Sequence, residues 1–264
     1  MSAGHLVAAG LTVRFAGVTA NDAVDLEVRP GEIVGLIGPN GAGKTTFFNT
    51  VTGFVAPAGG TVHYDGADVT HAAPAARAAL GMARTFQQSK LFSHLSVREN
   101  LLLGRNLAYG VPAWRSALRT PAARRAEAAA HAYVEELAGE LRVDDVLDGR
   151  VDELTYGTRR WVEVARALAM DPGLLLLDEP GAGMDPAESA AFGRVLRDAH
   201  RRRELSVLLI EHDVSLVLSV CDRIYVLDFG RLIATGTPDE IRRDEAVRRA
   251  WLGSAAGEVT APHG

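Results

Sequence analysis

The sequence of 264 residues has a single cysteine and no long hydrophobic run. One thiol cannot form a disulfide within the chain, so we expect Cys221 to be a small packed apolar residue in a reducing compartment. No stretch approaches the roughly 18 consecutive apolar residues that a membrane-spanning helix requires. Residues 1–9 lack a basic segment followed by an apolar core, the pattern of a secretory signal. We therefore expect any membrane role to depend on partner subunits.

A strong net charge of either sign is also absent. Lys and Arg number 28 against 33 Asp and Glu, which gives a net charge of -5. This balance provides no overall attraction for DNA or RNA, so we expect no nucleic-acid partner. The hydrophobic share of 47% suits one large domain, or two small ones, with a full core.

The distribution of apolar residues predicts an α/β fold. Alternating apolar and polar residues at 6–15 and 24–29 predict a small antiparallel flank. The nearly all-apolar runs at 174–177 and 207–210 favour a parallel sheet that is covered on both faces. Further elements are expected as strands at 32–37, 61–64, 82–86 and 224–227 and as a helix from Lys44 to about Thr52.

A long segment between these strands has a different composition. From Ser96 to about Leu154 the strand signal disappears and Ala, Arg and Leu dominate, which predicts a helical subdomain. Two helix starts within it are marked by capping patterns, Ser96 with Glu99 and Thr120 with Pro121.

The small polar residues from Ser254 onward predict a flexible tail over 254–264. The remaining chain is expected to form one domain over residues 6–253. In this arrangement the helical subdomain, at about 88–156, is inserted into a core that is built from the strands.

A glycine-rich loop stands between the predicted strand at 32–37 and the helix that follows it. Its glycines let successive backbone N–H groups turn toward a polyphosphate, and the helix N-terminus adds a positive dipole. Lys44 then places a charge near the β- and γ-phosphates, and the Thr45 hydroxyl can bind Mg²⁺. We expect ATP and Mg²⁺ at this loop, with nucleotide contacts from Gly38, Pro39, Asn40, Gly41, Ala42, Gly43, Lys44, Thr45 and Thr46.

Two adjacent carboxylates follow the apolar run at 174–177, at the strand edge where open α/β sheets bind ligands. Neighbouring strand positions alternate sides, so one acid can reach Mg²⁺ while the next reaches a water opposite the γ-phosphate. We assign Asp178 to the metal and Glu179 to orienting or deprotonating that water. Taken alone, an acid here could simply cap the next helix. The phosphate loop favours the catalytic interpretation.

These motifs indicate nucleotide chemistry, which kinases, GTPases, helicases and transport ATPases share. Residues 154–168, read as LTYGTRRWVEVARAL, end just before the carboxylate strand. This stretch resembles the signature segment of ATP-binding-cassette proteins. The resemblance runs from about Leu6 to Leu252, with every motif in the family's order. It implies an ATPase whose P-loop NTPase core has a mainly parallel sheet, an antiparallel β flank and a helical subdomain.

The resemblance assigns roles to residues that would carry little information alone. RTFQ at 84–87 is similar to the family's glutamine loop, GMDP at 183–186 to its D-loop, and EHD at 211–213 to its switch histidine. Phe15 takes the place of the aromatic residue that stacks on adenine. The resemblance implies that the catalytic residues are Lys44, Gln87, Glu179 and His212, and that the metal is bound by Thr45, Gln87 and Asp178.

Within the family, the sequence is more similar to the larger ATPase subunit of branched-chain amino-acid importers. The pointers include RTFQ at 84–87, the Tyr-Gly signature and AWLG at 250–253. The usual signature has Ser, Gly and Gln at its second, third and fifth positions, where this sequence has threonine, tyrosine and threonine. In the family the signature contacts the γ-phosphate of ATP held by a partner subunit, which implies such contacts for Thr155, Tyr156, Gly157 and Thr158.

The resemblance also implies partners. We expect a second, different cassette ATPase as heterodimer partner, two transmembrane permease subunits and an extracytoplasmic substrate-binding protein. The chain would lie peripherally on the cytoplasmic face of the cell membrane and power uptake of branched-chain or related amino acids, amides or urea. A short helix of a permease is expected to enter a groove lined by Phe86, Leu91, Phe92, Leu95 and Val97.

The main alternative is a soluble cassette ATPase that acts as a mechanical clamp in DNA repair or on ribosomes. Repair relatives carry a long coiled coil between phosphate loop and signature, and translation relatives usually carry two cassettes in one chain. This sequence has neither feature. A P-loop kinase would leave the signature and His212 without a purpose.

Overall fold

The computed structural model describes residues 3–85, 91–109 and 120–249. Gln87, Phe86 and the predicted tail at 254–264 lie outside these ranges. The strands are β1 (Leu6–Phe15), β2 (Val18–Val28), β3 (Ile33–Ile37), β4 (Gly59–Tyr64), β5 (Ala67–Asp68), β6 (Met82–Arg84), β7 (Leu174–Asp178), β8 (Ser206–Ile210), β9 (Arg223–Asp228) and β10 (Arg231–Gly236). The helices are α1 (Lys44–Val51), α2 (Pro74–Ala79), α3 (Val97–Tyr109), α5 (Pro121–Leu141), α6 (Tyr156–Ala169), α7 (Pro186–Arg203), α8 (Val214–Val220) and α9 (Pro238–Arg243).

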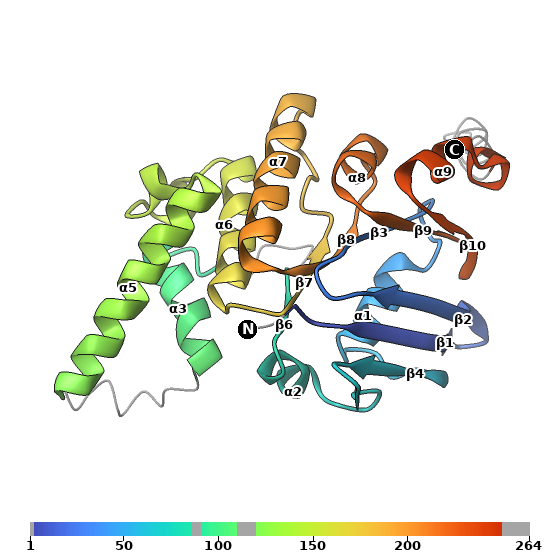
Figure 1. Cartoon of the computed structure of the whole chain (residues 1–264), viewed down its shortest axis with the longest axis horizontal. Coiled ribbons are helices and arrows are strands. Elements are labelled where there is room, and N and C mark those ends of the chain that lie inside the picture. Colours follow the sequence, from blue (N-terminus) through green and yellow to red (C-terminus); the bar gives the residue numbers. More distant parts are fainter. Residues whose placement is uncertain (1–2, 86–90, 110–119, 250–264) are drawn as a thin grey trace, which may run out of the picture.

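A six-stranded sheet in the order β10-β9-β3-β8-β7-β6 forms the centre of the molecule (Figure 1). Five of its strands are parallel, and β10 pairs antiparallel with β9 at one edge. Successive leucines of β7 serve two hydrophobic cores, with Leu175 and Leu177 in one and Leu174 and Leu176 in the other. Both faces of the sheet are therefore buried, which explains why its inner strands are apolar throughout.

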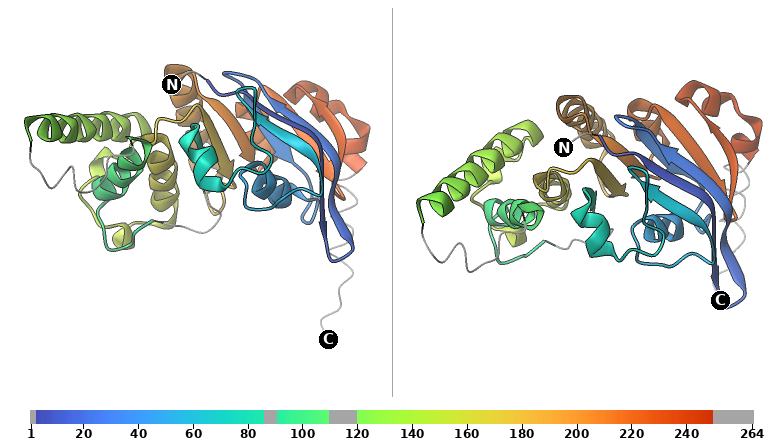
Figure 2. Two further views of the ribbon diagram at one scale, coloured as in Figure 1. Left: turned by 90° about the horizontal axis from the view of Figure 1, so that it is seen from below. Right: turned by 60° about the horizontal axis from the view of Figure 1, so that its bottom comes forward.

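The predicted antiparallel flank is confirmed as a second sheet in the order β2-β1-β4-β5. Helix α1 lies between the two sheets (Figure 2), and its Phe47, Phe48 and Val51 fill the core that they share. Two strands were not expected from the sequence, the short β5 and the half-buried β10. Strand β2 also begins earlier than expected, at Val18.

The predicted helical subdomain is formed by α3 and α5, which pack against α6 at the end of the molecule far from the antiparallel sheet (Figure 1). Both predicted caps are confirmed. Ser96 and Glu99 bond each other's backbone N–H groups, and the Thr120 hydroxyl accepts from the N–H of Ala123. The limits at 88 and 156 stay predictions.

The structure corrects one residue of the proposed membrane-subunit groove. Val97 opens α3 with its side chain fully buried, because it packs into the hydrophobic core that also contains residues of α5 and α6. By contrast, Phe92 is 57% exposed. Cys221 is buried, as expected. In the described ranges no helix has both the length and the apolar character needed to cross a membrane.

A buried arginine anchors the C-terminal end of α1. Arg77 of α2 is 2% exposed and donates to four backbone carbonyls, those of Thr50, Val51, Thr70 and Ala72, at 2.6 to 3.0 Å. Two of these carbonyls close α1, where the helix dipole is negative and favours a cation. The Arg77 side chain therefore helps to hold the end of the helix that carries the phosphate loop at its start.

We expect Arg77→Met to lower the free energy of unfolding by about 3 kcal/mol, because it leaves buried carbonyls without donors. Urea denaturation followed by circular dichroism measures this loss. The control is Arg124→Met on the exposed face of α5, for which we expect a change within about 0.5 kcal/mol. Equal unfolding midpoints for the two variants would contradict the role given to Arg77.

Candidate nucleotide site

The phosphate loop connects β3 to α1 in a conformation that depends on glycine. Gly41 and Gly43 have φ values of 80° and 99°, in the left-handed region. A Cβ at Gly43 would also collide with the carbonyl oxygen of Ala20. On the same side, Asn21 Nδ2 donates to the Gly43 carbonyl at 3.2 Å. The antiparallel sheet thus braces the loop from outside.

Lys44 opens α1 and is 5% exposed. Its Nζ donates to the carbonyls of Gly38 and Pro39 at 2.7 and 2.9 Å. Burial lowers the pKa of Lys44, and the charges of Glu179 and Asp178 oppose that effect. The ammonium group is thus held inside the curve of the phosphate loop.

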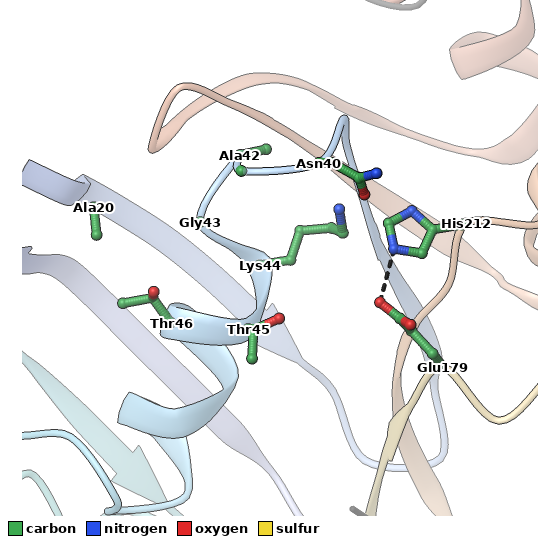
Figure 3. A pocket seen from close by; sticks show the side chains of 10 residues that line it. Ala20, Asn40, Ala42, Gly43, Lys44, Thr45, Thr46, Glu179 and His212 are labelled. Carbon is green, nitrogen blue, oxygen red and sulfur yellow. Dashed lines mark hydrogen bonds and ion pairs between the residues drawn. The ribbon is translucent and has the colours of Figure 1, made fainter. Parts of the chain in front are cut away.

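A cavity of about 630 Å³ opens over this loop. Figure 3 shows Glu179 and His212 on the side opposite Ala20, with Lys44 between them. Three strand-end loops, those after β3, β7 and β8, therefore contribute to one cavity. The lining residues are Ala20, Asn40, Gly41, Ala42, Gly43, Lys44, Thr45, Thr46, Glu179 and His212.

Asp178, the last residue of β7, is 1% exposed. Its Oδ2 accepts from Arg84 Nη2 at 2.9 Å, whereas its Oδ1 is buried with no hydrogen-bond partner in the described part of the chain. Burial raises the pKa of Asp178, and the hydrogen bond and charge of Arg84 lower it. Arg84 also donates to Asn49 and Thr52 of the α1 segment. It therefore joins β6, β7 and α1.

Glu179 adopts a backbone conformation that non-glycine residues rarely take, with φ at 51°. Its Oε1 lies 2.7 Å from His212 Nε2, the dashed contact in Figure 3. Backbone strain of this kind concentrates at functional sites. The turn sends the Glu179 side chain into the cavity, whereas that of Asp178 stays against the sheet.

The signature segment starts α6, away from this cavity. The Thr155 hydroxyl caps the helix by accepting from the Thr158 N–H, and the two hydroxyls lie 2.9 Å apart. Thr155 and Tyr156 are exposed. A methyl group at Gly183 would lie 2.8 Å from the Tyr156 ring. The tyrosine therefore packs over the D-loop of its own chain.

The structure brings most of the predicted residues together. Residues 40–46 of the phosphate loop line one cavity with Glu179 and His212, and Asp178 immediately precedes Glu179. Gly38 and Pro39, also predicted to contact the nucleotide, are absent from that lining. Phe15 is 49% exposed at the end of β1, outside the cavity lining. The four signature residues, Thr155 to Thr158, are also absent from that lining. Arg84 received no separate role from the sequence, although its place at the end of the strand beside β7 was a signal.

Comparison with protein families identifies the class. The family model described as ABC transporter matches residues 21–182. The chain belongs to the ABC transporter family. Accordingly, this ABC cassette binds and hydrolyses ATP. A second model, described as branched-chain amino acid ATP-binding cassette transporter, matches residues 231–257.

Curated relatives cover nearly the whole ABC cassette. It is 40% identical to the high-affinity branched-chain amino acid transport ATP-binding protein LivG of Salmonella typhimurium, over 97% of this chain and 100% of that protein. It is 38% identical to the corresponding protein BraF of Pseudomonas aeruginosa, over 97% and 100%. The lipopolysaccharide export system ATP-binding protein LptB of Escherichia coli is 40% identical, over 94% and 97%.

Solved structures agree with the fold of this ABC cassette. A nucleotide-free ATP-binding cassette from an ABC transporter has a TM-score of 0.80 at 28% identity, covering 95% of this chain and 99% of that one. The ADP conformation of an ATP-binding cassette has a TM-score of 0.81 at 27% identity, covering 96% and 99%. The P-loop NTPase core with its antiparallel flank and helical subdomain is thereby confirmed.

We expect Lys44→Ala to weaken ATP binding by about 30-fold, because a buried charge-assisted contact of roughly 2 kcal/mol is lost. Titration of the purified chain with a fluorescent ATP analogue measures the dissociation constant, and the melting temperature checks that the variant is folded. A folded variant with unchanged ATP affinity would contradict the assignment of the phosphate loop.

Proposed function

We propose that this chain powers import of branched-chain or related amino acids, amides or urea by hydrolysing ATP beneath two permease subunits. One observation carries the proposal most strongly. The cavity that joins Lys44, Glu179 and His212 occurs in a chain whose residues 231–257 match the branched-chain amino acid cassette model. Overall sequence identity does not distinguish amino-acid import from lipopolysaccharide export, since the LivG and LptB relatives are both 40% identical to this chain. The C-terminal match favours amino-acid import.

Within the site, Lys44 would exchange its two loop carbonyls for the β- and γ-phosphates of ATP. The ammonium group would favour this exchange because the phosphate groups are ionised, whereas the carbonyl groups are neutral. Glu179 would orient or deprotonate the attacking water, with His212 held at 2.7 Å beside it. Gln87 and Phe15 keep the roles that the family resemblance implies.

The residues present fit Mg²⁺. Asp178 Oδ1 is buried without a hydrogen-bond partner among the described residues, and Thr45 stands on the first turn of α1 in the cavity. The described residues contain no group of three or more His, Cys, Asp or Glu that could hold a metal. A small number of protein ligands is typical of Mg²⁺ sites, because substrate phosphates and water molecules supply the remaining ligands. Thr45, Asp178 and Gln87 would hold the ion, which would neutralise charge on the phosphates.

We further propose a heterodimer with a second cassette ATPase. Thr155, Tyr156, Gly157 and Thr158 lie outside the chain's own cavity, on an accessible or half-buried helix start. That position suits contact with the partner's nucleotide when two cassettes close face to face. The altered signature would then act on only one of the two ATP sites, while this chain's ATP meets the partner's signature.

The helical subdomain would contact the permease. Of the groove residues expected from the sequence, Phe92 is exposed and Leu91 and Leu95 are half-buried, so these three remain available. They precede α3 and follow the segment that contains Gln87. We propose that this surface receives a permease helix.

We also propose that the domain spans residues 6–253, with the helical subdomain at about 88–156.

We expect proteoliposomes with this chain, its sister ATPase, both permeases and the binding protein to take up leucine, isoleucine or valine when ATP and Mg²⁺ are supplied. Glu179→Gln in this chain should reduce uptake at least about 100-fold, because the water-activating carboxylate is lost. Uptake of radiolabelled substrate measures the effect, with other amino acids, amides and urea tested in parallel.

Two outcomes would refute parts of this proposal. Full uptake without the sister ATPase would show an active homodimer and end the heterodimer proposal. Failure to transport any member of the panel, together with ATP turnover that lipopolysaccharide stimulates, would favour the export function of the LptB relatives.

A further inference from the structure

Glu211 is a buried carboxylate to which the proposed mechanism gives no task. It is 3% exposed and stands between Ile210, the last residue of β8, and His212. It does not line the nucleotide cavity. Burial raises the pKa of Glu211, and hydrogen bonds from the backbone N–H groups of Gly181, His212 and Asp213 oppose that effect. The carboxylate is therefore surrounded by main-chain donors.

The two oxygens of Glu211 bind two different catalytic segments. Oε1 accepts the N–H of Gly181 at 2.5 Å, within the β7–α7 loop, residues 179–185. Oε2 accepts the N–H of His212 at 3.1 Å. A single side chain therefore bridges the segment of the proposed water-activating residue to the segment of the switch histidine.

This bridge lies where the backbone is strained. Glu179 begins the β7–α7 loop at a φ of 51°, two residues before Gly181. Its own N–H donates to the Ile210 carbonyl at 2.9 Å, and the Ala182 N–H donates back to the Glu179 carbonyl at 3.2 Å. Surrounding contacts must hold such a conformation, because an isolated residue would leave it. The Gly181 bond to Glu211 is one such contact, two residues after the strained position.

The absence of a side chain at Gly181 allows Glu211 to approach the loop backbone closely. A Cβ on Gly181 would lie 2.9 Å from Glu211 Oε1, closer than side-chain atoms normally approach. Glycine therefore allows the carboxylate to reach the loop backbone. In the same arrangement, the Glu179 carboxylate lies 2.7 Å from His212 Nε2.

We propose that Glu211 is a positioning residue for ATP hydrolysis, which holds the β7–α7 loop against the backbone of His212 so that Glu179 and His212 meet. This inference rests on the proposed role of Glu179 in hydrolysis. In this proposal Glu211 contacts neither the nucleotide nor the attacking water, and it acts only through Glu179 and His212. The competing interpretation is a carboxylate that stabilises the fold and has no specific effect on turnover.

The test compares Glu211→Ala and Glu211→Gln in the full chain assembled with its partner ATPase and permeases. We expect kcat to fall about 100-fold in Glu211→Ala, since a displacement of the base by about 1 Å has effects of this size. ATP affinity, measured with a fluorescent analogue, should stay within about twofold because the phosphate loop is not touched. Glu211→Gln should lose less, because its Oε1 can still accept the Gly181 N–H.

The matched control is Glu140→Gln. Glu140 is 13% exposed in α5 and pairs with Arg203 at 2.8 Å, outside the site. It should lower the melting temperature without changing kcat. If Glu211→Ala lowers the melting temperature as Glu140→Gln does and leaves kcat unchanged, the carboxylate is merely structural and the inference is overturned.

The double variant Glu179→Gln/Glu211→Ala decides whether Glu211 acts through Glu179. We expect its turnover to equal that of Glu179→Gln alone, because residues that act as a unit are not additive. A further loss of similar size in the double variant would overturn the inference and leave the proposed function standing. Wild-type turnover in Glu179→Gln alone would overturn the role of Glu179 and, with it, that of Glu211.

Discussion

The in-register pairing of three parallel strands determines where the phosphate loop, Glu179 and His212 lie. Leu36 of β3 pairs with Ile210 of β8, and Ile210 pairs with Asp178 of β7. Strands β7 and β8 end at these positions and β3 ends one residue later, so the loops that follow them meet at one edge of the sheet. A slip of one residue in β7 would exchange its leucines between the two cores and turn Asp178 to the other face. Hydrophobic burial on both faces therefore also fixes the geometry of the site.

Contacts beyond the sheet bring the loops to their final positions. The β7–α7 loop is held at Gly181 by Glu211, and at Gly183 it lies under the ring of Tyr156 from the signature helix. The Tyr156 hydroxyl accepts from Arg160, which pairs with the buried Glu163. The β7–α7 loop, which is proposed to act on this chain's ATP, is thus in contact with the signature helix, which is proposed to act on the partner's ATP.

Much of this arrangement could be predicted from the sequence because it depends on local patterns. Glycine spacing before Lys44 and the apolar run before Asp178 are consequences of phosphate binding and sheet burial. Strand β10 was missed because its residues are half-buried and mixed in polarity. Val97 was expected at a surface because a single apolar residue at a helix start does not reveal which way it faces.

The contributions of Arg84 and Glu211 could not be predicted from local patterns. Arg84 meets Asp178 across 94 positions, and Glu211 meets Gly181 across 30. Each contact exists only because parallel strands bring distant residues side by side. The sequence shows a charged residue near a motif, and only the fold shows which group it binds.

We infer that the loops after β3, β7 and β8 act as one nucleotide site. Hydrogen exchange of the full chain, followed by mass spectrometry with and without a non-hydrolysable ATP analogue and Mg²⁺, tests it most directly. We expect slower exchange in residues 38–46, 178–183 and 210–213 at the same analogue concentration. Protection confined to residues 38–46, with the other two segments unchanged at saturation, would contradict it.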